Sequence, residues 1–433
     1  MDHLINEMRK RGGREMRVFS YRTSGAWIAI QRPEEEVGAD SALDEIRRVL
    51  SDTLRCSNLV VLTGLGTSLH VNVDHAATEV NKKRTAQPGK FIAPTMWDLW
   101  EAARAESGAD FPRVLALSKL PESEQEKGNI EALLSHCKAA SEFVDDESQR
   151  DIITLFIEKT ERIVRDRVRF LGAADEVSVH ADLLRRLARR SSRKVRSKIF
   201  TTNYDLCFEH AARQGRYIVV DGFSHTTPQV FDSIYFGYDI VKRESNPDSH
   251  DFISNVFQLY KLHGSIDWTK NSTTNEIEKD PATESPVLVY PRNTKYELAF
   301  EQPYLEMMSA LQAAIRQPDT GLLIMGFGFN DSHISEPILS AIRSNLSLKV
   351  VICDPALSNK TADENNGRAQ AGSDTQNPYL KKTRYLIEHG DARLALISGT
   401  FEEVVPMLPD IAAQTDLEQH LERVRMLRGE GNV

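Results

Sequence analysis

The sequence predicts an α/β protein with a mostly parallel β-sheet and a helical insertion. Apolar runs of strand length recur along the chain, and helical patterns at 304–315 and 334–344 separate several of them, an alternation typical of parallel sheets. Residues 91–194 differ, because they carry long charged segments with helical spacing and no clear strand. At 433 residues, the chain is long enough to bury a large core.

Seven apolar runs are predicted to form strands. They span residues 58–68, 198–203, 217–220, 256–262, 287–290, 321–325 and 348–353. A helix is predicted to begin at Ser41, where Ser41 and Asp44 resemble a capping box and apolar residues follow with helical spacing through Leu54. Residues 361–377 are polar and contain glycine, which predicts a mobile loop, and an apolar stripe within 410–433 predicts one more helix.

The amino-acid composition limits the classes of function that this protein could have. With 54 Lys and Arg against 63 Asp and Glu, the net charge of −9 does not support general attraction to nucleic acid or to anionic membranes. The four cysteines, Cys56, Cys137, Cys207 and Cys353, lie far apart without a CxxC pair, which argues against a zinc cluster and fits a reducing cytoplasm. No apolar run is long enough for a signal sequence or a membrane span. We therefore expect a cytoplasmic protein without a bound metal.

The run from Arg185 to Lys198 is an exception to this charge balance, since it carries eight cations and no acid. The favoured interpretation is a solvated helix end whose cations complement the helix dipole. The alternative is a contact for nucleic acid or for an acidic partner, which leaves nucleic-acid binding an open question.

A first candidate ligand contact is the segment TGLGTS, Thr63 to Ser68, at the end of a predicted strand. Gly64 and Gly66 would let the backbone approach a diphosphate, while Thr67 and Ser68 offer hydroxyl groups. Glycine is also common in such turns for steric reasons alone. The motif by itself therefore leaves both interpretations open.

A second candidate is IFTTNYD, in which an apolar strand places Asn203 and Asp205 at its carboxyl end. Ligands of open α/β sheets bind outside those ends, so an amide and a carboxylate there are suited to hold a polar substrate. The alternative is a helix start, because Asn and Asp are preferred caps and an apolar helical pattern follows Asp205.

Three further strand ends carry polar residues or glycine. His263 and Gly264 follow the run 256–262, and a histidine there could accept a proton near neutral pH. Later strand ends present Gly326 and Gly328, then Asp331 as a predicted helix cap, and finally Asp354, which could bind a ribose hydroxyl.

The order of these five strand ends resembles that of the sirtuin-like NAD-binding family. The family's GAGxS turn, TQNxD strand end, His-Gly pair and later glycine turn stand here as Gly64-Leu65-Gly66-Thr67-Ser68, Thr201-Thr202-Asn203-Tyr204-Asp205, His263-Gly264 and Gly326-Phe327-Gly328. The resemblance covers roughly residues 57–90 and 195–405.

It implies a Rossmann-like, sirtuin-like NAD-binding domain at 57–90 and 195–410. An N-terminal segment and helix would occupy 1–56, a helical insertion 91–194 and a C-terminal helix 411–433.

Departures from the family pattern refine this resemblance. Thr202 replaces the glutamine before Asn203, no GIPDFR loop follows Ser68, and no four-cysteine zinc module follows His263. The sequences DGF at 221–223, HGS at 263–265 and GFGFNDSHI resemble the bacterial branch of the family that acts in anti-phage defence. Members of that branch degrade NAD, commonly as homo-oligomers or beside a partner such as a HerA-type ATPase or a short Argonaute.

The resemblance implies an NAD+ hydrolase that depletes NAD as a defence effector. Asn203 would position ribose and water, His263 would accept a proton, and Asp205 would help to hold nicotinamide. The glycine turns would seat the diphosphate, with Asp331 as a further contact, Gly264 would leave space for the nicotinamide ribose, and Asp354 would hold the adenosine ribose. The alternatives are a deacylase or ADP-ribosyl transferase, and a non-catalytic subunit that senses NAD or ADP-ribose.

Overall fold

The computed structural model describes residues 16–30, 41–71, 93–172, 175–191, 194–243, 250–288, 302–358 and 372–409. The predicted C-terminal helix, the end of the predicted strand at 287–290 and residues 361–371 of the predicted loop lie outside these ranges. Within the ranges, no helix has both the length and the apolar character needed to span a membrane.

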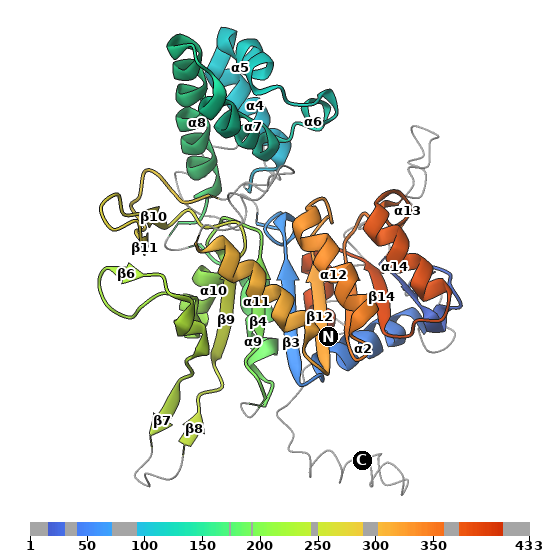
Figure 1. Cartoon of the computed structure of the whole chain (residues 1–433). Helices are drawn as coiled ribbons and strands as arrows, with labels where there is room; N and C mark the ends of the chain where they lie inside the picture. The colour runs from blue at the N-terminus through green and yellow to red at the C-terminus, as the bar shows by residue number, and fades with distance from the viewer. Residues whose placement is uncertain are drawn as a thin grey trace, which may run out of the picture.

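A sheet of nine strands forms the centre of the molecule (Figure 1). In spatial order the strands are β2 (Ile28–Ala29), β1 (Arg17–Ser20), β14 (Leu394–Ser398), β13 (Lys349–Cys353), β12 (Thr320–Met325), β3 (Asn58–Thr63), β4 (Lys198–Thr201), β9 (Val256–Lys261) and β5 (Ile218–Val220). All strands from β14 to β5 are parallel, whereas β1 and β2 add an antiparallel edge. The predicted α/β fold class with a mostly parallel sheet is confirmed.

The predicted strands differ from the observed ones in instructive ways. Six of the seven apolar runs form strands of the main sheet, but in the run 287–290 only Leu288 is seen to pair, in an isolated bridge with Gly264. The sequence analysis missed β1, β2 and β14. These strands are two to five residues long, and β1 pairs with β2 and with β14, which lies far away in the chain.

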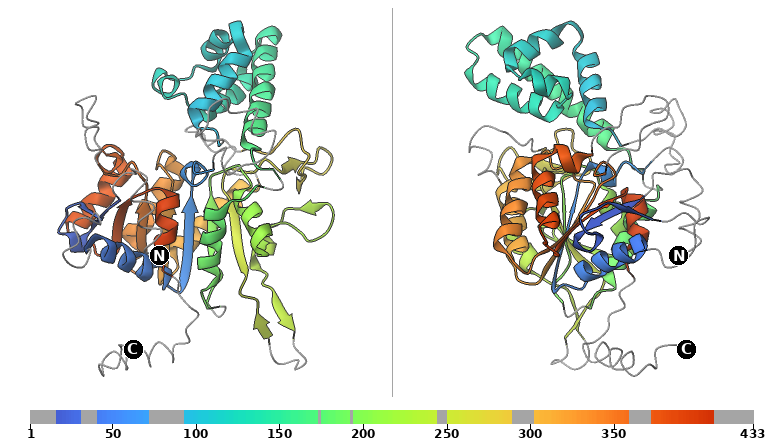
Figure 2. Two further views of the ribbon diagram at one scale, coloured as in Figure 1. Left: turned by 180° about the vertical axis from the view of Figure 1, so that it is seen from behind. Right: turned by 90° about the vertical axis from the view of Figure 1, so that its right-hand side faces the viewer.

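Helices cover both faces of the sheet, as the end-on view in Figure 2 shows. One face packs against α2 (Ser41–Leu54), α9 (Ser178–Ala188), α10 (Cys207–Gly215) and α15 (Phe401–Val404), and the other against α11 (Tyr304–Arg316), α12 (Ser332–Ser344) and α14 (Pro378–Glu388). The helix predicted from Ser41 is observed, and its Ile46 and Leu50 side chains are fully buried against the strands. Apolar stripes at helical spacing therefore supply both layers of the core.

The prediction of a mobile loop is wrong for residues 373–376. Ser373–Gln376 forms the short helix α13, and Asp374 within it is fully buried. The carboxylate of Asp374 accepts a hydrogen bond from the indole of Trp27 and pairs with Arg384 at 2.6 Å. Trp27, distant in sequence, and Arg384 in the following helix order a segment whose polar composition predicted a loop.

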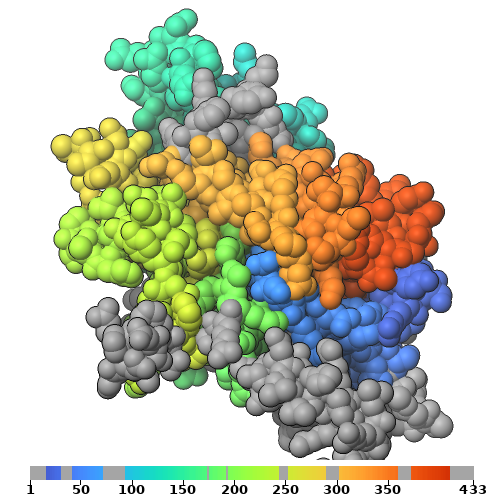
Figure 3. Space-filling view, turned by 60° about the horizontal axis from the view of Figure 1, so that its bottom comes forward, coloured from blue at the N-terminus to red at the C-terminus, as the bar shows by residue number. Residues whose placement is uncertain are grey.

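Five helices form a separate lobe, which we call the helical module (residues 93–172). They are α4 (Met96–Ser107), α5 (Phe111–Ser118), α6 (Glu122–Glu126), α7 (Ile130–Phe143) and α8 (Glu147–Val168). The lobe stands beyond the carboxyl ends of the central strands and is drawn in teal in the space-filling view of Figure 3. Helix α9 falls within the predicted insertion but packs on the main sheet, with Leu183 and Leu187 in that core.

Two small antiparallel sheets complete the fold. One contains β10 (Trp268–Lys270), β11 (Ile277–Lys279) and β6 (Gln229–Val230), and the other is a hairpin of β7 (Val241–Arg243) and β8 (His250–Phe252). Both lie on the side of the main sheet where β5 forms the edge (Figure 1).

The basic run 185–198 was predicted to be a solvated helix end, which is wrong for its buried residues Arg186 and Arg190, although the contacts of the run are structural. Arg186 is buried, pairs with Asp182 at 2.8 Å and donates to the carbonyl of Leu408. Arg190 and Lys194 donate to backbone carbonyls at 55–57, at the end of α2. These cations therefore fix α9 and the segment after it to the rest of the core.

Replacing Arg186 by Met should lower the free energy of unfolding by about 1–3 kcal/mol, because Asp182 and the Leu408 carbonyl lose a buried donor. Arg189 is an exposed arginine in the same run, and Arg189→Met should change the free energy by less than about 0.5 kcal/mol. Chemical denaturation followed by circular dichroism measures both. Equal effects of the two substitutions would contradict a structural role specific to Arg186.

Candidate active site

The predicted site residues follow strands that end at one edge of the sheet. β4 follows β3 in the chain and lies on one side of it in the sheet, whereas the later strand β12 lies on the other side. The direction in which strands are added to the sheet therefore reverses at β3. Ligands of open α/β sheets bind at such a reversal, outside the carboxyl ends of the strands. The ladder aligns Met325, Thr63, Thr201 and Lys261 across four neighbouring strands. The turns after these residues consequently lie side by side.

The two glycine turns pack directly against each other. A Cβ atom on Gly64 would stand 2.7 Å from the carbonyl oxygen of Gly326, and one on Gly66 would stand 2.6 Å from the Gly326 Cα. Gly326 also has φ +62°, a conformation that other residues rarely adopt. The backbone amide of Gly66 donates to the Gly326 carbonyl at 3.0 Å. Packing alone thus requires glycine at these three positions.

The polar groups of the first glycine turn bond to one another and to a neighbouring side chain. Its residues 65–67 form a short 3-10 helix, in which the amides of Thr67 and Ser68 donate to the carbonyls of Gly64 and Leu65 at 2.9 Å. The Thr67 hydroxyl donates to the Gly64 carbonyl and the Ser68 hydroxyl to Asp205. Both side chains are fully buried. That these groups contact a diphosphate remains a prediction.

Asn203 and Asp205 tie the turn after β4 to the first glycine turn. The Asn203 side-chain amide donates to the Gly64 carbonyl at 3.1 Å and to the Ser68 hydroxyl at 2.9 Å. One carboxylate oxygen of Asp205 accepts from Ser68 at 2.7 Å, and the other accepts from the Cys207 amide at the start of α10. Asp205 therefore makes the contacts expected of a helix start, and its contact with nicotinamide stays a prediction.

His263 is buried and hydrogen-bonded to Asp331, with 3.0 Å between Nε2 and Oδ2. Burial alone would lower the pKa of His263, but the hydrogen bond and charge of Asp331, with the charge of Glu131, raise the pKa overall. Burial likewise would raise the pKa of Asp331, yet its bond to His263 lowers it. A hydrogen on Nε2, directed at Asp331, leaves Nδ1 as the nitrogen that accepts a proton.

Asp331 serves two purposes at once. Its Oδ1 accepts from the His333 amide at 2.8 Å, which caps the N-terminus of α12 as the sequence predicted, while Oδ2 binds His263. The carboxylate that begins the helix is therefore also the group that orients the histidine.

The remaining predicted residues lie along the same edge. Gly264 has φ +86°, and a Cβ there would stand 2.2 Å from the Val287 carbonyl oxygen, so packing rather than room for a ligand accounts for its missing side chain. Gly328 has more space, with Asn330 Nδ2 nearest at 3.2 Å. Asp354 follows β13 and accepts from the Ala356 amide at 2.8 Å.

Lys261 is a site residue that the sequence analysis missed. It is 3% exposed, and its ammonium group donates to the carbonyls of Asp205 and Tyr204, to Glu209 at 3.0 Å and to the Ser265 hydroxyl at 2.9 Å. The cation thereby joins the turns after β4 and β9. A lysine within a mostly apolar run was the available signal, because a buried ammonium requires several oxygen partners.

Glu131 and Tyr204 were also missed, and no pattern in the sequence connects them. The Tyr204 hydroxyl donates to the Glu131 carboxylate at 2.8 Å, joining the helical module to the turn that contains Asn203. The rings of Tyr204 and His263 have centroids 6.4 Å apart.

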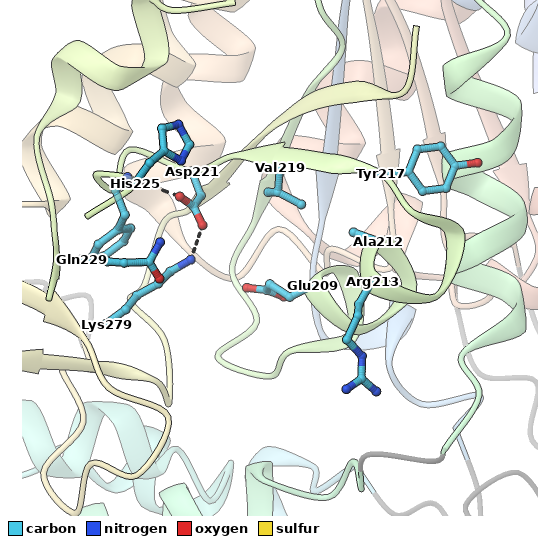
Figure 4. A pocket seen from close by; sticks show the side chains of 10 residues that line it. Glu209, Ala212, Arg213, Tyr217, Val219, Asp221, His225, Gln229 and Lys279 are labelled. Atoms are coloured by element: carbon cyan, nitrogen blue, oxygen red, sulfur yellow. Dashed lines mark hydrogen bonds and ion pairs between the residues drawn. The ribbon is translucent and has the colours of Figure 1, made fainter. Parts of the chain in front are cut away.

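A cavity of about 280 Å³ opens beside this edge, between α10, β5 and the small sheet (Figure 4). Glu209, Ala212, Arg213, Tyr217, Val219, Asp221, Phe223, His225, Gln229 and Lys279 line it. None of the predicted site residues does, and its volume is small for a dinucleotide. Glu209 nonetheless contacts Lys261, so the wall of the cavity is bonded to the candidate site.

A comparison with protein families identifies the segment that carries these residues. Residues 197–373 match the family model of a SIR2-like domain. The match supports a sirtuin-like family, implies NAD binding and is compatible with NAD-related activity. No curated protein matches the chain. In the described parts of the chain, no three His, Cys, Asp or Glu residues gather in a group that could hold a metal ion.

The SIR2-like segment contains the candidate residues from Asn203 to Asp354, whereas the first glycine turn at 64–68 lies outside it. The sheet brings the two parts together, since β3 stands between β12 and β4. The SIR2-like segment and the preceding turn thus form one site.

Replacing Asp331 by Asn should lower the pKa of His263, because the substitution removes the carboxylate charge that favours the imidazolium. Asparagine is as good a helix cap as aspartate, so α12 should keep its first turn. An NMR titration of histidine Cε1 protons measures the effect, with the His263 signal assigned by its loss in His263→Ala. An unchanged pKa would contradict the role given to Asp331.

Proposed function

We propose that the protein is an NAD+ hydrolase, which cleaves NAD+ and water into nicotinamide, ADP-ribose and a proton. The observation that carries this proposal is the His263–Asp331 pair, which lies within a SIR2-like segment at the strand reversal. Asn203 follows β4, the strand paired with the one that leads to His263. An oriented base and a side-chain amide are thus available where a bound ligand is expected.

The proposed reaction breaks the bond between nicotinamide and ribose and forms a bond between ribose and water. The electron pair of the broken bond passes to nicotinamide, which leaves as a neutral molecule. Asn203 orients the ribose and the attacking water, and His263 accepts the water proton at Nδ1 while Asp331 holds the hydrogen on Nε2. The negative charges of Asp331 and Glu131, which both act on His263, would also favour the developing positive charge on the ribose.

The proposed biological role rests on the resemblance to the bacterial branch of the sirtuin-like family. We propose a cytoplasmic effector of anti-phage defence that depletes NAD in an infected cell. It would act as a homo-oligomer or beside a partner such as a HerA-type ATPase, with a short Argonaute as the alternative. A deacylase or ADP-ribosyl transferase would instead need a protein substrate, and a sensing subunit would bind NAD without cleaving it.

Substituting His263 or Asn203 by Ala should reduce NAD+ hydrolysis at least 100-fold, because each removes a group that acts in the proposed transition state (roughly 10²–10⁴ per group). The matched control is His389→Ala, which alters an exposed histidine at the end of α14, outside the SIR2-like segment, and should leave the rate unchanged. Chromatography of nicotinamide and ADP-ribose measures the rates, with and without the protein encoded beside it. Parent-like hydrolysis by either site variant would show that the assignment is wrong.

The pH dependence should follow the protonation of His263. A histidine base must be neutral to accept a proton, so kcat should fall as the pH drops through the raised pKa of His263. In Asp331→Asn the pKa is lower, and the acidic limb of the kcat profile should therefore move to lower pH, even though the maximal rate falls. Initial rates of NAD+ loss, taken over about four pH units around the ordinary histidine pKa of about 6.5, measure this limb. A limb that stays in place would exclude His263 as the group that titrates.

A further inference from the structure

The helical module contacts the candidate site at two places. Its core contains Leu133 and Ile153, and the same apolar cluster includes Tyr204, Ile266 and Leu288 from loops of the main body. Tyr204 and Ile266 lie in the loops after β4 and β9, the strands that lead to Asn203 and His263, whereas Leu288 follows β11 and pairs with Gly264. The module is therefore continuous with the packing that supports the site.

The first contact is polar and comes from the start of α7. Glu131 is the second residue of this helix, whose N-cap is Asn129. Its carboxylate accepts from the Tyr204 hydroxyl at 2.8 Å. Tyr204 lies between Asn203 and Asp205, and its backbone carbonyl accepts from the Ile266 amide at 3.2 Å. Fixing the Tyr204 side chain thus constrains the turn that places Asn203.

The second contact comes from the end of α8. Arg165 donates to the Glu284 carbonyl at 2.8 Å, and Arg169 donates to the carbonyls of Ile266 and Thr283 at 3.4 Å. Ile266 follows His263 by three residues. The module consequently holds the backbone on both the Asn203 and the His263 sides of the site.

Glu131 also acts on His263 through its charge. The groups that face the histidine are the carboxylate of Asp331 from α12, the carboxylate of Glu131 from α7 and the ring of Tyr204. Asp331 is itself influenced by His333. Burial, with the charge of Asp331 as a smaller cause, raises the pKa of Tyr304 to about 12. Burial raises the pKa of Glu131, and the charge of His263 and the Tyr204 bond oppose that rise.

We infer that Glu131 is a positioning residue through which the helical module controls the site. By holding Tyr204 it places Asn203, and by its negative charge it stabilises the imidazolium form of His263. A displacement of the module that withdrew Glu131 would weaken both effects while leaving the sheet intact. The module is thereby assigned a regulatory role at the site of the proposed NAD+ hydrolase.

The first experiment does not depend on the proposed activity. Glu131→Gln keeps an oxygen that can accept from Tyr204 but removes the charge, so the pKa of His263 should fall in an NMR titration of the full chain. The matched control is Glu161→Gln, which removes the same charge from the same module, where Glu161 pairs with Lys138 at 2.7 Å between α8 and α7. This control should leave the His263 pKa unchanged. A His263 pKa in Glu131→Gln equal to that of the parent overturns the electrostatic part of the inference.

The second experiment rests on the proposed function. Tyr204→Phe keeps the ring but removes the hydroxyl, and should lower kcat about 10-fold to 100-fold with little change in KM, because a displaced Asn203 orients the reactants poorly. The double variant with Glu131→Gln should be less impaired than the product of the two single effects, since both act through one contact. If the reductions in kcat of the two single variants multiply in the double variant, the two residues act independently, and the inferred coupling between Glu131 and Tyr204 is overturned. If the parent does not cleave NAD+, the proposed function fails, while the NMR result still decides the contact of Glu131 with His263.

A variant that does not fold is recognised by the loss of its far-ultraviolet circular dichroism. In that event Glu131→Asp replaces Glu131→Gln, since it keeps the charge but shortens the side chain. Its kcat should fall through loss of the Tyr204 bond, while the His263 signal continues to titrate with a raised pKa. Parent-like kcat in Glu131→Asp overturns the positioning role.

Discussion

The contact between the two glycine turns is the constraint on which the rest of the site depends. Gly64 and Gly66 approach Gly326 so closely that a Cβ atom at any of the three would meet backbone atoms at 2.6–2.7 Å. Larger residues would push the ends of β3 and β12 apart, because backbone cannot yield as a flexible side chain does. Asn203 is bonded to the first turn, so its position depends on the same contact.

Buried charges extend this constraint across the sheet. Lys261 joins the carbonyls of Tyr204 and Asp205 to Ser265, and Ser265 in turn donates to Asp267 at 2.5 Å. Burying an ammonium group is costly unless several oxygens surround it, so the turns after β4 and β9 are held in one arrangement. Together with the hydrogen bonds from Asn203 to the first glycine turn, these contacts link the ends of β3, β4 and β9. A shift in one of these strand ends is therefore transmitted to the others.

The sequence predicted the centre of the sheet well and its edge poorly. β9 and β12 are buried at every residue and consist mostly of apolar residues, as is typical of central parallel strands, so their predicted bounds differ from the observed ones by one residue. β14 is a short apolar run that was overlooked, whereas β1 joins the sheet through antiparallel pairing that places Arg17 opposite Ser398. Pairing between segments so far apart leaves no local pattern in the sequence.

The candidate site shows the same division. The positions of Asn203 and His263 were predictable, because the carboxyl ends of parallel strands meet at one edge. Their partners were not: Asp331 lies 68 residues from His263, and Glu131 lies 73 residues from Tyr204. Asp331 was predicted as a helix cap, and only the packing of α12 against the edge shows its second oxygen on the histidine. Candidate catalytic residues can thus be predicted from strand ends. The groups that orient them or shift their pKa are brought close only by tertiary contacts.

The place of the helical module in the chain explains how it can influence the site. It is inserted between β3 and β4, neighbouring parallel strands, and α9 follows it on the main sheet as the crossover helix. The chain therefore leaves β3 at the edge where ligands are expected, forms the module there, and only then returns along α9. An insertion at this point can add Glu131 to the site without disturbing any strand pairing. Because the same edge carries Asn203 and His263, the Glu131–Tyr204 hydrogen bond couples the position of the module to these residues.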